Sequence, residues 1–591
     1  MQIVQSDAPV TYRFRLPRGI YRALRFDPID REGVVTFSDA KIFDAHQKLV
    51  THLTVSQFQV VQQISSFQID DDSVQMRTVP HANDPILAVS LDAPIFLGVD
   101  RSRRLLEIGA TFGVMFLLCS GLLWGANTFY VRHTERVTSL WRRLVASMTD
   151  HPWTAIGGVA LLAVVVSCYP VVFFGKSFVS PNFSDGTFLL YDHFPTLPGY
   201  DERRTENAKG ADVGAIMWQQ MPYAVIQSRA ILQNFELPLW NRYNASGLTL
   251  LGQGQSMFGD PLHVLVILSG GASWAWDIKY LVAKFLFTAG AGLTVYTTTR
   301  HLPASLLLAF SSAFIGFFSF RFNHPAFFSV CYAPWILLCW FNIVLAPTRR
   351  LGTLWIGALV VANWMVLTSG TVKEAYMLLV FLNLGGVLVF LSSLRGLLLA
   401  RSKVWQLGVT GVAFVLLSMP IWLTFLDALR QSYTGYNLPH AWQIQPGLLI
   451  GFFDDLFYRQ LNEGERVYNP AANFLILFGC LWSLAQIKLL LANQFYRALG
   501  LSALLPFALA FGIIPSGVIV RLPFLGNVAH IDNTFSCILL IHMIILAGFG
   551  LQACWTALAE KEWTSNGVVV LFLLGVLLGL YFGTTQAAQR T

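Results

Sequence analysis

The stretch TFSCILLIHMIILAGFGLQACWT, residues 534–556, decides the fold, because it contains no Asp, Glu, Lys or Arg. A helix rises about 1.5 Å per residue, so about 20 apolar residues cross a bilayer core of roughly 30 Å. Similar stretches recur along most of the chain, and we predict about twelve membrane-spanning helices. They lie near residues 105–126, 154–175, 277–299, 304–321, 325–346, 352–370, 375–394, 405–426, 470–490, 499–519, 534–556 and 566–586.

The composition agrees with a membrane protein. Of the 591 residues, 54% are hydrophobic and only 12% are charged, whereas soluble domains carry about 25% charged residues. This excludes a water-soluble enzyme, a disordered chain and a nucleic-acid-binding protein. The seven cysteines lie within or beside apolar stretches and none has CxxC spacing, so neither a disulfide framework nor a cysteine metal site is predicted.

Residues 1–104 are different, since they contain 12 Lys and Arg and 12 Asp and Glu. Short alternating runs at residues 11–16 and 34–37 are typical of strands, and the turn residues Asp27-Pro28 and Pro80-His81 separate such runs. We predict a small β-sandwich-like module over 1–104, followed by a multi-spanning membrane domain over 105–591 with a large loop at 176–276. The predicted fold is therefore a mainly α, polytopic helical bundle with an amino-terminal β module.

Basic residues in alternate loops predict the orientation, because Lys and Arg concentrate on the cytoplasmic side of membrane proteins. The long loops 176–276 and 427–469 then face outward. The residues that set this orientation are Arg132, Arg136, Arg142, Arg143, Arg349, Arg350, Arg395, Arg401, Lys403, Lys488 and Arg497.

The same orientation places residues 1–104 outside, although no apolar segment precedes them to carry a folded module across the membrane. Two explanations remain open. A helix upstream of this sequence would make the module extracytoplasmic, which is the interpretation we favour. Otherwise the module is cytoplasmic and the segment 105–126 is not a span.

Polar residues gather in the loop 176–262, while the predicted spans hold few charges, chiefly Glu107 and Lys284. Residues 216–235 have the apolar spacing of a helix lying along the membrane interface. Asp212 stands at the amino end of that helix, where the dipole favours a carboxylate. An ordinary N-cap is an equally simple explanation of Asp212.

Around this helix the order Asp212, Gln219-Gln220-Met221-Pro222, Leu237-Pro238-Leu239-Trp240-Asn241, Gln253-Gly254-Gln255 and Asp260-Pro261-Leu262 resembles the YfhO-like bacterial membrane proteins, which are grouped with GT-C type glycosyltransferases. Later segments extend the resemblance over roughly residues 150–590. They are Asn323-His324-Pro325, Ser369-Gly370-Thr371-Val372-Lys373-Glu374 and His530-Ile531-Asp532-Asn533. One departure is that Val372-Lys373 replaces a His-Pro pair expected before Glu374.

The resemblance implies a membrane glycosyltransferase of the bacterial cytoplasmic membrane with an extracytoplasmic active face. Its donor would be a polyprenyl-phosphate sugar and its acceptor a cell-envelope glycan or lipid, with membrane lipids as further partners and no nucleic acid. Such a transfer needs a carboxylate for the acceptor proton and positive charge for the leaving phosphate. Asp212 is the first candidate for the catalytic carboxylate and Asp185 the second, in an inverting displacement.

For substrate binding the resemblance indicates Trp240, Asn241, Arg242, His324, Lys373, Glu374, His530 and Asp532. No cofactor is identified, and a divalent cation (Mg or Mn) remains an option with unknown ligands. Each residue also has a simpler explanation. Interfacial Arg and Lys contact lipid headgroups, Lys373-Glu374 forms a local pair at a helix end, and a His at a helix end is usually structural.

Two rival functions remain. A lipid-linked glycan flippase or transporter needs polar residues at mid-membrane depth around a cavity, and the sparse charge in the spans argues against it. A non-catalytic membrane scaffold predicts that the outer carboxylates scatter and line no common pocket.

Overall fold

The computed structural model contains two compact units, Met1–Arg142 and Arg143–Thr591, which are described separately. The predicted boundary after residue 104 lies outside the described residues and stays a prediction. The structure describes residues 10–590 except 15, 17–18, 30, 45–46, 71, 83–84, 98–112, 114–116, 118–119, 122–142, 144, 180–215, 244–246, 253–254, 321–323, 371, 394–396, 432–442, 445, 454–471, 522–524, 526–527, 529 and 562.

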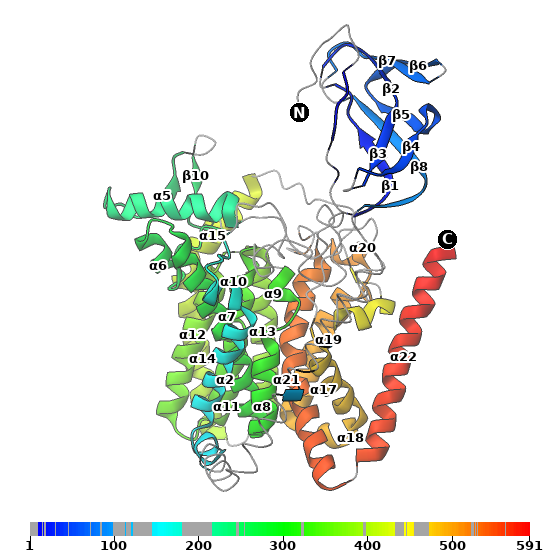
Figure 1. Ribbon diagram of the computed structural model, residues 1–591. Coiled ribbons are helices and arrows are strands. Elements are labelled where there is room, and N and C mark those ends of the chain that lie inside the picture. Colours follow the sequence, from blue (N-terminus) through cyan, green and yellow to red (C-terminus); the bar gives the residue numbers. More distant parts are fainter. Residues whose placement is uncertain are drawn as a thin grey trace. The chain divides into compact units, whose positions relative to one another are not determined.

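The first unit is a module of antiparallel strands, which confirms a strand-rich amino-terminal region (Figure 1). β1 (Gly19–Phe26), β8 (Ile86–Leu97) and β5 (Phe58–Gln62) form one sheet in the order β1-β8-β5. A second sheet has the order β2-β7-β6, from Val34–Ser38, Ser73–Thr78 and Ile64–Asp70, and β3 (Ala40–Phe43) pairs with β4 (Leu49–Leu53).

Side chains from all three sheets share one apolar core, which includes Ile42, Phe58, Met76 and Leu87. The predicted strand at 34–37 is confirmed by β2, and β1 ends just before Asp27-Pro28 as expected. The prediction of a strand at 11–16 is wrong for the residues described there. Pro17 follows that run, and because proline has no N–H to donate to a ladder, regular pairing begins at Gly19.

The second unit consists mainly of helices. Their bounds are α2 Pro152–Ser167, α3 Tyr169–Phe173, η3 Ile216–Gln220, α5 Met221–Leu232, α6 His263–Leu268, α7 Ser273–Thr299, α8 Leu302–Ser312, α9 Phe317–Phe320, α10 Ala326–Tyr332, α11 Pro334–Leu345, α12 Arg349–Thr368, α13 Val372–Ser392, α14 Leu397–Leu417, α15 Met419–Gln431, η4 Pro446–Phe452, α17 Phe474–Ala485, α18 Ile487–Leu490, α19 Gln494–Ala510, α20 Ser516–Ile519, α21 Ile531–Ala559 and α22 Trp563–Arg590.

These helices confirm a membrane-embedded, mainly helical protein. Among the described residues, six helices are long and apolar enough to span a bilayer, or seven if α14 and α15, bent by 51° near Pro420, form one span. Segments predicted as spans at 154–175, 304–321 and 470–490 contain shorter helices, Pro152–Ser167, Leu302–Ser312 and Phe474–Ala485. Most of 105–126 lies outside the description, so the number twelve stays a prediction.

The helix α21, which contains the stretch 534–556, is almost wholly buried in the bundle, whereas α22 is largely exposed. Small residues let α17 and α21 approach closely. A Cβ added to Gly550 would overlap the carbonyl oxygen of Gly479, and one added to Gly479 would lie 2.7 Å from the carbonyl oxygen of Ala547. Backbones in membrane bundles approach in this way where glycine and alanine face each other.

One end of the bundle carries a cap made of η3, α5, a short hairpin and α6. In Figure 1, α5 runs across the end of the bundle, while α7 and α12 run along it. Pro222 lies in the first turn of α5, directly after the helical turn η3. After α5, β9 (Trp240–Asn241) pairs with β10 (Leu248–Thr249).

Candidate functional site

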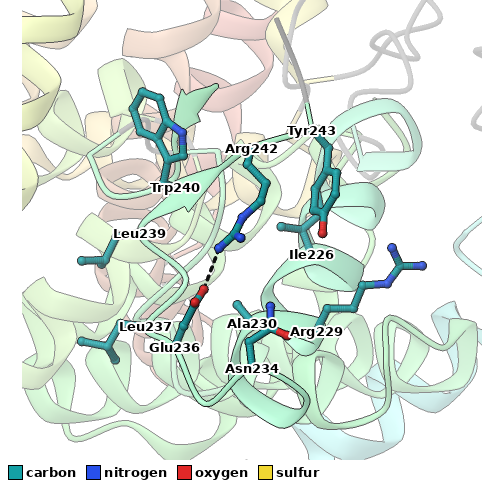
Figure 2. A pocket seen from close by; sticks show the side chains of 10 residues that line it. All are labelled: Ile226, Arg229, Ala230, Asn234, Glu236, Leu237, Leu239, Trp240, Arg242 and Tyr243. Atoms are coloured by element: carbon teal, nitrogen blue, oxygen red, sulfur yellow. Dashed lines mark hydrogen bonds and ion pairs between the residues drawn. The ribbon is translucent and has the colours of Figure 1, made fainter. Parts of the chain in front are cut away.

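A pocket of about 100 Å³ lies where the carboxyl end of α5 meets the hairpin (Figure 2). Arg229 and Asn234 line it on the α5 side, and Glu236, Arg242 and Tyr243 on the hairpin side. Arg242 Nη2 donates a 2.7 Å hydrogen bond to Glu236 Oε2, and both side chains are more than half exposed. The pocket is therefore shallow, polar and open to solvent.

Apolar side chains surround this pocket and also face solvent. Phe235 is 90% exposed and Leu237 is 73% exposed, and Trp240 and Tyr243 are exposed as well. In Figure 2, Leu237 and Leu239 point away from Arg242. A surface that combines arginines with exposed aromatic and leucine side chains suits an amphiphile with an anionic head.

The predicted hairpin residues divide into two kinds. Trp240 and Arg242 line the pocket. Asn241 is buried, and its Oδ1 accepts a 2.9 Å hydrogen bond from the backbone N–H of Tyr243. Asn241 thus holds the hairpin turn. Gly247 has a φ of +119°, and a Cβ there would overlap the Trp240 ring, so glycine is required for the indole to pack on this turn.

Below the cap lies a buried ion pair that the sequence did not predict. Lys279 Nζ is 2.7 Å from Asp260 Oδ2, and both side chains are fully buried. Tyr332 Oη donates to the same carboxylate at 3.2 Å from Oδ2. Lys279 Nζ also lies 4.3 Å from the Phe328 ring centroid, within cation–π range.

The pair joins the loop before α6 to the spans α7 and α10, and several motif segments of the sequence converge beside it. A Cβ added to Gly370 would lie 2.7 Å from Pro325 Cβ and 2.9 Å from Met257 Cε. Lys279 Nζ is 3.1 Å from Met257 Sδ. The hydroxyls of Ser329 and Ser369 are hydrogen bonded at 2.7 Å.

His324 stands next to this convergence, but its Nδ1 accepts a 3.1 Å hydrogen bond from the backbone N–H of Ala326. It therefore caps the start of α10, which matches the simpler explanation for a histidine at a helix end. Lys373 and Glu374 begin α13 and are half-buried. Neither residue lines the hairpin pocket.

The second predicted pair is brought together by the structure. His530 Nδ1 is 3.6 Å from Asp532 Oδ1 at the start of α21, with Asp532 fully buried and His530 partly exposed. This proximity follows from their spacing in sequence. The described contacts do not join it to the hairpin pocket.

Both candidate catalytic carboxylates, Asp212 and Asp185, lie outside the described residues, and their assignment stays a prediction. Among the residues that the structure does describe, no three His, Cys, Asp or Glu side chains are grouped to hold a metal ion. His530 and Asp532 supply two such groups at most.

The sequence did not predict three residues of the buried pair and the pocket, which are Lys279, Tyr332 and Arg229. Asp260 belongs to a motif, but no rule of spacing connects a loop aspartate with a lysine in α7, the second helix after it. Lys279 offered one usable signal, since it is a second lysine near Lys284 in an apolar segment, and charges there are rarely left unpaired. Arg229 lies on the exposed side of α5, where its side chain is free to line the pocket.

The sequence matches no protein-family model and no curated protein. The family resemblance of its motifs thus stays a prediction.

Proposed function

We propose that the chain is a membrane glycosyltransferase, GT-C-like, that moves a sugar from a polyprenyl-phosphate donor to a cell-envelope glycan or lipid on the outer face of a bacterial cytoplasmic membrane. The observation that carries the proposal is the hairpin pocket. Arg229 and Arg242 offer positive charge for a phosphate, and the exposed Phe235, Leu237 and Trp240 offer an apolar surface beside it. A polyprenyl phosphate has this combination of an anionic head and a long apolar tail.

The transfer we propose is a one-step inverting displacement. The acceptor hydroxyl attacks the anomeric carbon, the bond from that carbon to the phosphate oxygen breaks, and polyprenyl phosphate leaves. Asp212 takes the hydroxyl proton, or else serves as a metal ligand, with Asp185 as the second candidate. Cations near the phosphate, among which we include Lys373, stabilise the charge of the leaving group.

The remaining motif residues are proposed to bind substrate. Gly370 lies close to Pro325 and to Met257, between the motif segments 253–255 and 260–262, which supports a shared role for these segments. Glu374, His324, His530 and Asp532 are proposed as members of the same outer face. The buried Asp260–Lys279 pair would act on this face as a positioning element, since it fixes the loop that follows the hairpin.

The catalytic proposal is tested by transfer from a labelled polyprenyl-phosphate sugar in proteoliposomes. Asp212→Asn should lower the rate by about 10² to 10⁴, because general-base catalysis contributes a factor of that order. Asp201→Asn, in the charged run 201–204, is the matched control and should keep the parent rate. Parental transfer by Asp212→Asn would exclude the catalytic assignment.

The pocket is tested by the binding of polyprenyl phosphate to protein in nanodiscs. Arg229→Gln should weaken binding about tenfold, since one charge-assisted hydrogen bond is worth roughly 1.5 kcal/mol or more. Arg350→Gln, an exposed arginine at the start of α12, is the control. Equal affinities of parent and Arg229→Gln would remove the observation on which the proposal rests.

A lipid-linked glycan flippase or transporter is the second candidate, favoured by charges inside the spans. Lys284 is 4% exposed and lies 11 residues from the start of α7, about 16 Å along the helix. Its Nζ is 3.5 Å from Cys168 Sγ. Charges at such depth often mark transport paths. Flux of lipid-linked glycan across proteoliposomes without formation of a glycosidic bond would favour this function.

A further inference from the structure

Buried polar groups without hydrogen-bond partners occur in η3, α5, α6 and the first turn of α7. They belong to Gln220, Gln227, His263 and Trp276, all of which are fully buried. Neither amide atom of Gln220 has a partner, nor have Gln227 Oε1, the two ring nitrogens of His263 and Trp276 Nε1. We call these four residues the α5–α6 seam.

The seam is closed by tight contacts. A Cβ added to Gly271, in the turn between α6 and α7, would lie 3.7 Å from Ala224 Cβ and 3.2 Å from Val225 Cγ2 of α5. The rings of His263 and Trp276 are 5.2 Å apart in an edge-on arrangement. On its other side, Gln227 Nε2 donates a 2.7 Å hydrogen bond to the Ser256 carbonyl.

Several unpartnered buried groups on neighbouring elements are uncommon, because native proteins satisfy about nine in ten of them. When α5 packs on α6, these groups lose their hydrogen bonds to water and gain none from the protein. This favours a state in which they have a hydrogen-bond partner. The helix α5 lies across the end of the bundle and does not run along it with the spans (Figure 1).

The seam groups are neutral, and they include both donors and acceptors. Amides and an indole N–H carry no charge. Burial, with the nearby charge of Lys279, holds the pKa of His263 well below its usual range, so the imidazole is neutral at pH 7. Neutral donors and acceptors beside aromatic rings match the hydroxyl groups and the apolar ring face of a sugar, and they do not match a phosphate or a carboxylate.

We propose that the α5–α6 seam is a binding site for a neutral sugar ring, which enters when α5 separates from α6. The choice of a sugar rests on the proposed glycosyltransferase function. The ring belongs either to the lipid-linked donor or to the acceptor glycan. The arms of the experiment distinguish these two sources.

A disulfide that locks the seam shut provides the test. The 3.7 Å Cβ separation of positions 224 and 271 falls within the 3.5–4.5 Å range of disulfides, so the double variant Ala224→Cys with Gly271→Cys should close under mild oxidation. Gly271 has a φ of +84°, which strains any other residue. The reduced double variant, Gly271→Cys alone and the oxidised parent are therefore the controls.

Three probes are bound to protein in nanodiscs: polyprenyl phosphate, polyprenyl-phosphate glucose and a soluble glucose oligosaccharide. If the seam holds the donor sugar, oxidation weakens binding of polyprenyl-phosphate glucose more than tenfold, reductant restores it, and polyprenyl phosphate is unaffected. If the seam holds the acceptor, the oligosaccharide arm alone shows this loss. Unchanged affinity in both sugar arms of a fully oxidised sample would overturn the proposal.

The variants His263→Phe and Gln227→Leu give a second readout. Each removes seam groups that would bind hydroxyls, so sugar affinity should fall about tenfold. The melting temperature of His263→Phe should stay equal or rise, because both ring nitrogens that it removes are unpartnered. Gln227→Leu also loses the hydrogen bond to the Ser256 carbonyl, so its melting temperature should fall. Loss of sugar affinity only in proportion to lost stability would overturn the proposal. Failure of the parent to bind either lipid would refute the proposed function. The oligosaccharide measurement would then still show whether the seam binds a sugar.

Discussion

Replacing Lys279 by methionine should destabilise the protein by about 3 kcal/mol. The substitution leaves the Asp260 carboxylate fully buried without the ammonium that lies 2.7 Å away. Removing one partner of a buried ion pair costs about 3–5 kcal/mol, because the remaining charge is neither solvated nor neutralised. The low end applies here, since the Tyr332 hydroxyl still donates to the same carboxylate. Methionine has a similar length and flexibility, so the loss does not reflect a large cavity.

The free energy of unfolding is measured by titration with SDS in mixed micelles, for Lys279→Met, Asp260→Asn and the double variant. The double variant should be less destabilised than the sum of the single variants by about 1–3 kcal/mol, because each single change leaves a partner behind. Arg242→Gln breaks the exposed pair with Glu236 and should cost less than about 1 kcal/mol. A Lys279→Met variant within about 1 kcal/mol of the parent, or additive single effects, would refute a buried charged pair.

Three further predictions follow from packing and burial. Gly550→Ala should lower the free energy of unfolding by about 1–3 kcal/mol, because its Cβ would overlap the Gly479 carbonyl. Gly575→Ala, whose Cβ meets nothing within 4 Å, should leave that free energy unchanged or raise it by up to about 1 kcal/mol. Unfolding in SDS compares the two variants. Stability should fall below about pH 6.5 by up to roughly 1.4 kcal/mol per pH unit, since the unfolded chain protonates His263 before the folded chain does. His263→Phe should flatten this dependence in thermal unfolding at several pH values, and an unchanged slope would contradict the assignment. Gly247→Val should disorder the hairpin, because the Trp240 ring occupies the space of a Cβ at position 247. Binding of polyprenyl phosphate should therefore weaken, while the melting temperature of the bundle changes little.

Helices in the membrane unit follow from the sequence because a bilayer imposes one length scale. The stretch 534–556 needs no partner to be recognised, and α21 contains it with a few residues to spare. Where proline interrupts an apolar segment, composition alone overestimates the helix. Pro170 is the second residue of α3 and comes three residues after α2 ends at Ser167. Pro420 lies beside the bend between α14 and α15. Hydropathy registers apolar content and does not register the hydrogen bond that proline lacks.

The site was predictable only where its residues are neighbours in sequence. Trp240 and Arg242 belong to one hairpin, and His530 and Asp532 to one helix turn, so their proximity follows from local structure. The pairing of Asp260 with Lys279 depends on how α6 folds back onto α7, which no local pattern encodes. The Gly370 contact with Pro325 likewise comes from packing between α10 and α12–α13.

The buried charges bear on the choice between enzyme and transporter more than their number suggests. The sequence predicts few charges in the spans, but the structure buries Lys279 as well as Lys284, so the sparse charge is a weaker argument against transport. Yet Asp260 and Lys279 neutralise each other with no exposed surface, and a transport path needs charges that reach water or cargo. The hairpin pocket, in contrast, keeps Arg229 and Arg242 open to solvent beside exposed apolar side chains. Because the accessible Arg229 binds a ligand more readily than the buried Lys279, which is paired with Asp260, we place the proposed phosphate binding in the cap. The buried pair is best understood as what holds the loop of that cap in place.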